Sequence, residues 1–243
     1  MCSAICSRAE SKCVPGVMMM SSLDWPRLPF KPALFFVGLL LYATEADAQQ
    51  KWSFELCGML PCNLSLPLVI RQSGQPDIDL TAQYRSEPLV TPVCWMWRIA
   101  RWSDNCSWEL QAIHHKLYLE NVPPEVQSFS LSHGLNLVTI NRGWLLSDYV
   151  VRVGAGIALA HPESTIRGKP FPEDQGIFGM GYYVSGPALI AGAGKQLRLM
   201  DGLFFTIEAM AAASYANVPV KDGDAHLYNV VFQVNFGLGY GFE

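Results

Sequence analysis

Histidine, serine and carboxylate residues gather in three short segments of this 243-residue chain, and together they are the residue types of a hydrolytic triad. In such a triad a histidine takes a proton from a serine hydroxyl while a carboxylate orients the imidazole ring. Ser132 directly precedes His133, and the segment His161-Pro-Glu163 supplies a further carboxylate. The candidate bases are His115 and His133, the candidate nucleophiles are Ser130 and Ser132, and the candidate orienting carboxylates are Glu109 and Glu163.

The alternation of the chain around Ser132 works against this triad. Residues Phe129–Leu137 alternate between apolar and small polar side chains, as in a strand with two unlike faces. Strict alternation places His133 on the apolar face and Ser132 on the other, so only a β-bulge at Gly134 would bring them together. The simpler interpretation is that the histidines are amphipathic residues at a membrane surface. We expect no metal site, because no carboxylate pair completes a ligand set with His114, His115, His133 and His161.

The elements that must position these groups are strands, and the clearest of them is the last, Tyr228–Phe242. One face of this strand is polar or glycine, and the other face is apolar throughout. A length of about ten residues suffices for a tilted strand to cross a bilayer. The edge strand of a soluble β-sandwich is the alternative. The apolar face consists of Phe232, Val234, Phe236, Leu238, Tyr240 and Phe242.

This last stretch resembles the closing strand of Gram-negative outer-membrane β-barrels. In that family an alternating apolar strand ends in an aromatic residue and is recognised by the barrel-assembly machinery. Here Glu243 follows Phe242, so the aromatic residue does not stand in the terminal position. The resemblance implies a place in the outer membrane, contact with its lipid and lipopolysaccharide, and assembly by that machinery.

A looser resemblance is to the lipid A 3-O-deacylases, small outer-membrane barrels whose motif pairs a histidine with a serine two residues later. In this chain Leu117 stands two residues after His115, and Leu135 two residues after His133. The nucleophile is therefore missing from its place in the motif. A lipid-A-modifying hydrolase is carried as the second functional hypothesis.

Composition fits a membrane barrel better than a soluble domain. Charged residues make up 16% of the chain and apolar residues 50%, which suits strands with an apolar residue at every second position. The formal net charge of −4 gives no basic surface for nucleic acid. We expect a monomer without a cofactor.

The beginning of the chain predicts a secretory signal peptide. A positive segment with Arg27 and Lys31 precedes the apolar run Ala33–Ala43, and Ala46-Asp-Ala48 is a cleavage site of the usual kind. We expect residues 1–48 to be the signal peptide and residues 49–243 to be the barrel. The true start is expected near Met18, Met19 or Met20.

Four cysteines follow the predicted signal peptide. An exported protein permits disulfides, and Cys57 with Cys62 would close the tip of the first hairpin. Unpaired thiols are an equally good interpretation of the four: Cys57, Cys62, Cys94 and Cys106.

Alternating runs separated by turn residues predict an all-β, antiparallel up-and-down barrel of about ten strands. Leu66–Gln72 is the weakest run, and omitting it alone would leave an odd number, which bacterial barrels of this kind do not have. The alternative is eight strands with a short hairpin. Short turns that alternate with longer loops support the up-and-down order; we place them at Ser73–Asp77, Trp102–Cys106, Arg142–Asp148 and Leu197–Asp201.

The faces opposite the apolar ones should line the barrel interior, and they carry charge. Unpaired buried charges are costly, so acids and guanidiniums in a narrow lumen should pair and plug it. We therefore expect a structural or surface-binding barrel at the lipopolysaccharide leaflet, with a narrow channel as a further alternative. The predicted lumen network is Glu55, Arg71, Asp79, Arg85, Arg98, Glu109, Arg152 and Glu208.

Overall fold

The computed structural model describes residues 52–243, and their regular structure consists of thirteen β-strands. None of these described residues belongs to a helix that is long and apolar enough to cross a membrane. The predicted signal peptide, residues 1–48, and the start near Met18 lie outside the described residues.

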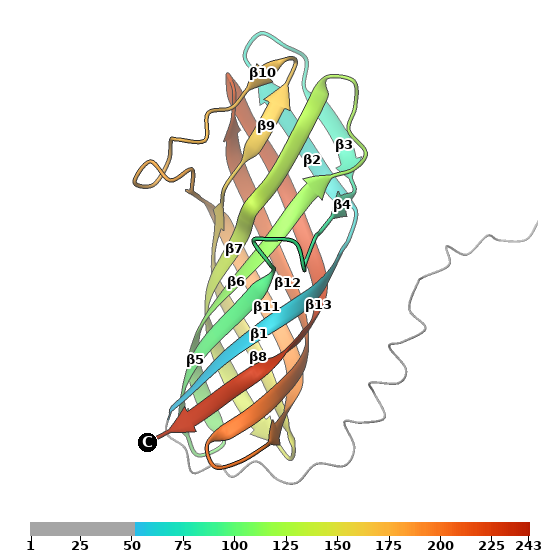
Figure 1. Cartoon of the computed structure of the whole chain (residues 1–243). Coiled ribbons are helices and arrows are strands. Elements are labelled where there is room, and N and C mark those ends of the chain that lie inside the picture. The colour runs from blue at the N-terminus through green and yellow to red at the C-terminus, as the bar shows by residue number, and fades with distance from the viewer. Residues whose placement is uncertain (1–51) are drawn as a thin grey trace, which may run out of the picture. The chain divides into compact units, whose positions relative to one another are not determined.

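Eight of the strands close into a ring in which each pairs antiparallel with the next, and the last returns to the first. Figure 1 shows blue β1 and red β13 side by side where the ring closes, from Trp52 opposite Phe242 to Asn63 opposite Val231. The ring strands are β1 (Trp52–Asn63), β5 (Trp95–Ser103), β6 (Cys106–Leu119), β7 (Val126–Leu146), β8 (Tyr149–Ala160), β11 (Tyr183–Arg198), β12 (Leu203–Val220) and β13 (Gly223–Phe242).

The ring therefore has eight strands, the alternative count, and not ten. The two remaining predicted strands form a hairpin of β2 (Leu66–Gln72) and β3 (Ile78–Ala82) outside the ring. Both β1 and β2 pair with the same edge of β13, β1 from Phe242 to Val231 and β2 from Leu227 to Gly223. Because β1 already closes the ring below, β2 and β3 only add to the sheet above it.

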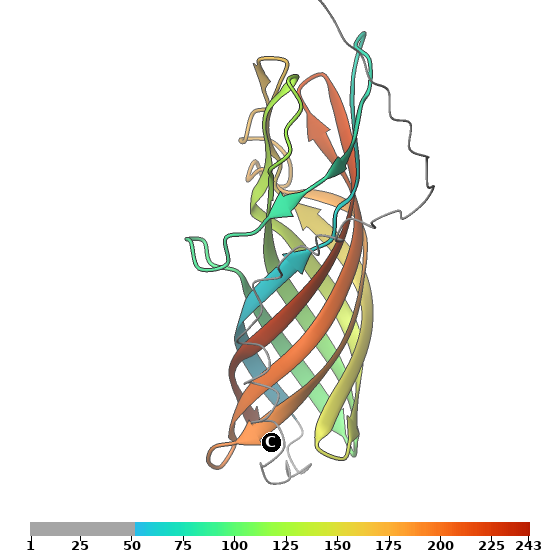
Figure 2. The ribbon, with the colours of Figure 1, turned by 90° about the vertical axis from the view of Figure 1, so that its right-hand side faces the viewer.

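Three further short strands continue the sheet at the same end. β4 (Tyr84–Arg85) pairs with the upper end of β6, β9 (Glu163–Ile166) pairs with the upper end of β7, and β10 (Lys169–Pro170) pairs with β9. Figure 2 shows these pieces above one end of the ring. We call this region the extension; it comprises β2, β3, β4, β9, β10, the ends of β6 and β7 with the loop between them (117–131), and residues 216–220 and 223–227 of β12 and β13.

Tight turns connect the ring strands at the opposite end, where β13 also ends (Figure 1). Asp104 between β5 and β6, and Ser147 between β7 and β8, have positive φ values of 52° and 55°, as short turns of this kind demand. The predicted turn Ser73–Asp77 instead joins β2 to β3, in the extension.

Burial divides the ring into two unlike faces. The whole predicted apolar face of β13, from Phe232 to Phe242, is exposed on the outside, while Gln233 and Asn235 are buried inside. The apolar face of Phe129–Leu137 behaves differently, because Leu135 and Leu137 are buried inside the ring and do not face lipid. A closed antiparallel ring with an apolar exterior and a polar interior is a transmembrane β-barrel.

Candidate functional site

Two groups of polar side chains stand out in the barrel, and the first is a network of charges inside the ring. It joins three carboxylates and two guanidiniums from five strands, and each of these residues is at most 2% exposed. The members are Glu55 of β1, Arg98 of β5, Glu109 of β6, Arg152 of β8 and Glu208 of β12.

Each guanidinium of the network contacts all three carboxylates. Arg98 reaches Glu208 at 2.8 Å, Glu55 at 3.2 Å and Glu109 at 3.4 Å. Arg152 reaches Glu208 at 2.8 Å, Glu109 at 3.0 Å and Glu55 at 3.5 Å. Buried charges are tolerated when partners of opposite sign and further hydrogen bonds satisfy them, and both conditions hold here.

Neutral side chains supply the further hydrogen bonds around this network. Thr206 donates to Glu55 at 2.8 Å, Ser107 donates to Glu109 at 2.8 Å, and Asn235 donates to Glu208 at 3.0 Å. Gln111 accepts a bond of 2.8 Å from Nε of Arg98. The network thus crosses the lumen as one hydrogen-bonded layer.

Five of the eight residues predicted for the lumen network meet in this layer, and three do not. Arg71, Asp79 and Arg85 lie in β2, β3 and β4, with exposed side chains. Arg71 pairs with Asp77, and Arg85 pairs with Glu87. They lie outside the lumen because their strands belong to the extension. There the apolar face of each strand packs inward and the polar face, which carries these three residues, is exposed to water.

Toward the extension, the interior of the ring changes from charged to apolar. Met96, Ile113 and Leu137 are neighbours across β5, β6 and β7, and all three are buried. The amides of Gln111 and Gln233 contact the sulfur of Met210 at 3.7 and 3.8 Å, where the two environments meet.

The second polar group lies on β7 and β9 at the junction of ring and extension, and a break in the sheet creates it. Pro162 separates β8, which ends at Ala160, from β9, which begins at Glu163. On β7 the partner changes from β8 at Leu135 to β9 at Ser130. Since proline has no N–H to donate, it favours this interruption of the ladder.

A β-bulge in β7 completes the junction. Between the pairs His115–Leu135 and Leu117–Leu131, three residues of β7 stand opposite the single residue Lys116 of β6. Gly134 in this bulge has φ of +115°, and a Cβ there would lie 2.7 Å from Nδ1 of His114. This is the β-bulge at Gly134 that Ser132 and His133 need in order to meet, as the alternation along this strand required. The bulged residues are Ser132, His133 and Gly134.

The bulge brings Ser132 and His133 to the carboxylate of Glu163. Nδ1 of His133 lies 2.6 Å from Oε1 of Glu163 and 3.2 Å from the hydroxyl of Ser132, and that hydroxyl also donates to Glu163. A second histidine, His161, places its Nδ1 3.6 Å from the same carboxylate oxygen. We call Ser132, His133, His161 and Glu163 the junction cluster.

This arrangement differs from a hydrolytic triad in one respect. In a triad the serine and the carboxylate use opposite nitrogens of the histidine ring, so that a proton can pass across it. Here Ser132 and Glu163 both meet Nδ1 of His133. The carboxylate therefore competes with the serine for one atom and does not orient the ring for it.

The other catalytic candidates lie elsewhere. His115 is buried, with Nε2 3.1 Å from the hydroxyl of Ser86, and Glu109 belongs to the lumen network. His161, from the segment that supplies Glu163, also lies beside Ser132 and His133, and Tyr182 joins them although the sequence did not point to it. The ring of Tyr182 packs edge-on against His161 at 5.0 Å, and its hydroxyl donates to the carbonyl of His133 at 3.1 Å.

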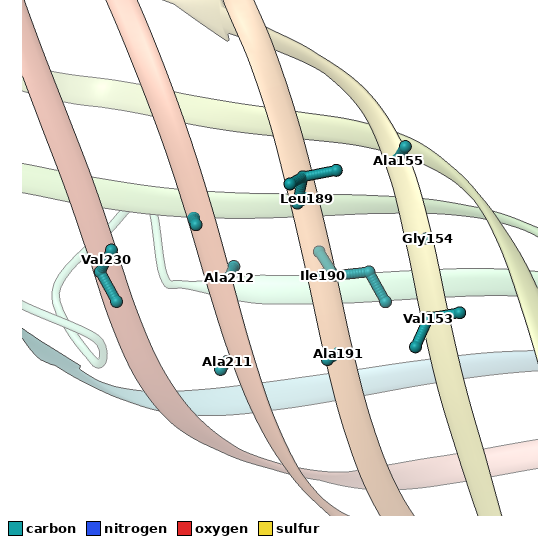
Figure 3. Close-up of a pocket in the computed structure, with 10 residues that line it drawn as sticks. Val153, Gly154, Ala155, Leu189, Ile190, Ala191, Ala211, Ala212 and Val230 are labelled. Carbon is teal, nitrogen blue, oxygen red and sulfur yellow. The ribbon is translucent and has the colours of Figure 1, made fainter.

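A shallow apolar hollow of about 600 Å³ lies on the outer face of the ring, over β8, β11, β12 and β13 (Figure 3). Val153 and Leu189 stand at its edges, and the small side chains of Ala191 and Ala211 leave the space between them. The hollow lies on the apolar face of the ring, which in membrane barrels is the face turned to lipid, and no described residue that lines it carries a polar side chain that could do chemistry.

The four cysteines of the described residues, Cys57, Cys62, Cys94 and Cys106, are all free thiols. Cys57 in β1 and Cys94, directly before β5, are buried.

No protein-family model matches the sequence, and no curated protein matches it. Several solved structures resemble it. The outer membrane protein AlkL is 11% identical, with a TM-score of 0.45 over 83% of this chain and 95% of that one. The outer membrane protein OprG of Pseudomonas aeruginosa is 13% identical, with a TM-score of 0.40 over 80% and 97%. The attachment invasion locus protein Ail of Yersinia pestis is 10% identical, with a TM-score of 0.38 over 79% and 100%.

The closed ring and its apolar exterior decide the class of protein. The chain is an outer-membrane type of β-barrel. It combines an eight-stranded ring, a charged layer across the lumen and an extension with a side-chain cluster at its base.

Proposed function

We propose that this protein is a barrel with a closed lumen, which anchors the extension in the outer membrane so that it contacts lipopolysaccharide or an external partner. The observation that carries this proposal is the buried charge network. Arg98 and Arg152 each contact carboxylates from several strands across the lumen, so every charged side chain of the network is held by an oppositely charged partner and the layer fills the interior.

The extension supports the second half of the proposal, because it has an apolar core of its own. A protruding segment with a packed core is rigid, and a rigid surface binds with a smaller loss of conformational entropy. Its fully buried side chains include Leu68, Ile70, Leu117, Leu131, Ile166 and Val218.

Two loops project sideways from the barrel and carry the most exposed apolar residues of the described chain. Leu89, in the loop between β4 and β5, is 79% exposed, and Phe178, in the loop between β10 and β11, is 91% exposed. Both loops are visible away from the strands, the first in Figure 2 and the second in Figure 1. Groups of exposed apolar side chains mark contact sites for protein or lipid, and each loop has such a group, Leu89 with Val90 and Phe178 with Met180.

Conductance tests the closed lumen. Purified protein in a planar bilayer should give no large, stable single-channel steps. Arg152→Ala, which removes one of the two guanidiniums, should introduce a leak. Arg142→Ala is the control, because Arg142 faces outward over the ring of Trp108 at 5.1 Å. Stable steps from the wild-type protein would contradict the proposal.

Vesicle binding tests the loops. The double variant Leu89→Ser/Phe178→Ser should lower the affinity of the protein in detergent micelles for vesicles that contain lipopolysaccharide. Met200→Ser, a change of an exposed apolar residue in the β11–β12 turn at the opposite end of the barrel, is the control. Equal binding by both variants would remove these loops as the contact site.

The hydrolase is the second candidate, since Ser132, His133 and Glu163 do meet in the junction cluster. Mass spectrometry of lipid A from cells with and without the gene distinguishes a hydrolase from a barrel that only binds. We expect identical lipid A, because the serine and the carboxylate share one ring nitrogen. A lipid A lacking one acyl chain only in cells with the gene would favour the enzyme.

A further inference from the structure

We propose that His133, His161 and Glu163 bind a divalent transition-metal ion of the zinc type where ring and extension meet. Each of these residues offers a ligand atom, and the three atoms all lie within 4.8 Å of one another. Two imidazoles and one carboxylate are a known ligand set for zinc with one open position. The proposal does not depend on the role as a closed, surface-binding barrel that is proposed above. It is the opposite of the expectation, drawn from the sequence, that the protein has no metal site.

The spacing of the three atoms suits a tetrahedral ion. Zinc lies about 2.0–2.2 Å from nitrogen and oxygen ligands, so two ligands at a tetrahedral angle are separated by about 3.3–3.6 Å. The Glu163 oxygen lies 3.6 Å from Nδ1 of His161, which fits without movement. It lies 2.6 Å from Nδ1 of His133, a hydrogen-bond distance, and His133 must therefore withdraw by less than about 1 Å to admit an ion.

A second observation points to a ligand at the same place. His161 is only 7% exposed, and its Nδ1 is buried with no hydrogen-bond partner. Buried polar atoms without a partner are uncommon in proteins and require an explanation. This nitrogen looks toward Glu163, and a metal ion between them would satisfy it.

The ring of His161 is held in this orientation by its neighbours. Tyr182 packs edge-on against it at 5.0 Å, and Gly181, with φ of +75°, lies so close that a Cβ there would be 2.2 Å from Nε2 of His161. A ligand that is fixed before the ion arrives binds it with a smaller entropic loss. Gly181 and Tyr182 are therefore positioning residues for the ion.

The ligand types select the class of metal, and the surface gives it access. Two nitrogen donors favour zinc, copper or nickel over calcium and magnesium, which prefer oxygen. The side chain of His133 is more than half exposed, so an ion from solution reaches the cluster. The Ser132 hydroxyl contacts both His133 and Glu163 and is the nearest further oxygen that the cluster offers.

Metal titration of the full, folded chain tests the site. After treatment with a chelator, the wild-type protein should bind one equivalent of Zn²⁺ in competition with a chromogenic chelator. Co²⁺ at the same site should give the intense visible absorption of a tetrahedral complex. No saturable Zn²⁺ binding by the wild-type protein would overturn the proposal.

Variants that keep the shape of the cluster assign the ligands. His161→Phe retains a ring for Tyr182 to pack on, and Glu163→Gln retains a partner for Ser132. Each should weaken Zn²⁺ binding by more than about 100-fold, since loss of an outer-shell partner alone costs about 10- to 100-fold. Unaltered affinity in either variant would overturn the assignment.

His226 provides the matched control. Its Nε2 lies 2.8 Å from Asp224, so it is also a histidine beside a carboxylate, but the pair has no second histidine. His226→Phe should bind Zn²⁺ as the wild-type protein does. Circular dichroism of every variant shows whether the barrel has formed. If a folded His226→Phe bound Zn²⁺ as weakly as the His161→Phe and Glu163→Gln variants do, the ion would not be bound at the junction cluster alone and the proposal would be overturned.

Discussion

The ring and the extension are built from the same strands, yet their interiors have opposite chemistry. The inward face of β12 carries Thr206 and Glu208 in the ring, and Val218 and Val220 in the extension. A strand turned toward lipid must hide its polar groups inside, whereas a strand above the membrane must hide its apolar groups. The alternation of residues along a strand thus defines two faces, and the surrounding medium decides which of them is the interior.

The largest expected effect comes from unpairing the interior of the ring. Arg98→Met should lower the free energy of unfolding by about 3–5 kcal/mol, because three buried carboxylates must then share the one remaining guanidinium, Arg152. Arg101→Met on the same strand should cost about 1 kcal/mol or less, since Arg101 lies outside, over the ring of Trp52 at 5.7 Å. Urea unfolding in detergent measures both, and equal losses would contradict the inverted interior.

The interior of the extension should respond to loss of volume. Leu68 is fully buried, so Leu68→Ala should destabilise its surroundings by about 2–5 kcal/mol. Because β2 lies outside the ring, the effect should be local: faster hydrogen exchange in β2 and β3, with β1 and the part of β13 that pairs with β1 unaltered. Loss of protection throughout the ring would show that the two regions unfold together. Leu64→Ala, at an exposed position, is the control.

The outer surfaces give a third contrast, between a phenylalanine of the ring and a valine of the extension that are similarly exposed. Phe236 in the ring is 38% exposed and Val122 in the extension is 44% exposed. Phe236→Lys should cost about 2–4 kcal/mol in a bilayer, because the charge meets lipid. Val122→Lys should change stability by no more than about 0.5 kcal/mol, because it meets water. Unfolding in lipid vesicles measures both, and similar costs would place both residues in the same medium.

The smallest effect is expected at the tips of the extension. Lys169 donates to Asp222 at 2.7 Å, and this hydrogen bond lowers the pKa of Asp222 below its ordinary value. A lowered carboxyl pKa stabilises the folded state while the group is ionised, and the contribution is lost as the pH falls through that pKa. The protection of the β12–β13 turn against hydrogen exchange, taken relative to the intrinsic exchange rate at each pH, should therefore fall in acid. In Asp222→Asn the exchange should already be fast at neutral pH, and an unchanged pH profile would argue against the pair.

Much of the ring could be predicted because lipid enforces its pattern. In β13 every second residue from Phe232 to Phe242 is apolar and exposed, as the sequence indicated. The same rule placed Glu55, Arg98, Glu109, Arg152 and Glu208 on inward faces.

The extension could not be separated from the ring by the same rule. Leu66–Gln72 and Ile78–Ala82 alternate as ring strands do, but their apolar faces pack on each other and not on lipid. Arg71, Asp79 and Arg85 were assigned to the lumen for this reason, and the strand count rose from eight to ten. Both β1 and β2 pair with one edge of β13, and β2 stays outside the ring because β1 occupies the ring part of that edge. The residues of β2 itself do not indicate which part of β13 they will pair with.

The junction cluster shows a different limit. The residues Ser132, His133 and Glu163 were named from the sequence, but their meeting depends on a bulge that shifts the register of β7. Gly134 was the one indication of that bulge, because glycine tolerates the positive φ found there. Tyr182 approaches from a loop distant in sequence, and nothing in its local pattern pointed to the histidines.

The pairing of β1 with β13 also sets the order in which this molecule can form. The first strand of the ring finds its partner only when the last strand is present, and the twelve matched positions between them span almost the whole described chain. Contacts between such distant segments are slow to form, since the intervening chain must be ordered first. Until then the open sheet has two unpaired edges and the lumen charges remain accessible to water. Closure is therefore expected to be the last and most cooperative step of folding, at which Thr206 of β12 reaches Glu55 of β1 and the lumen is sealed.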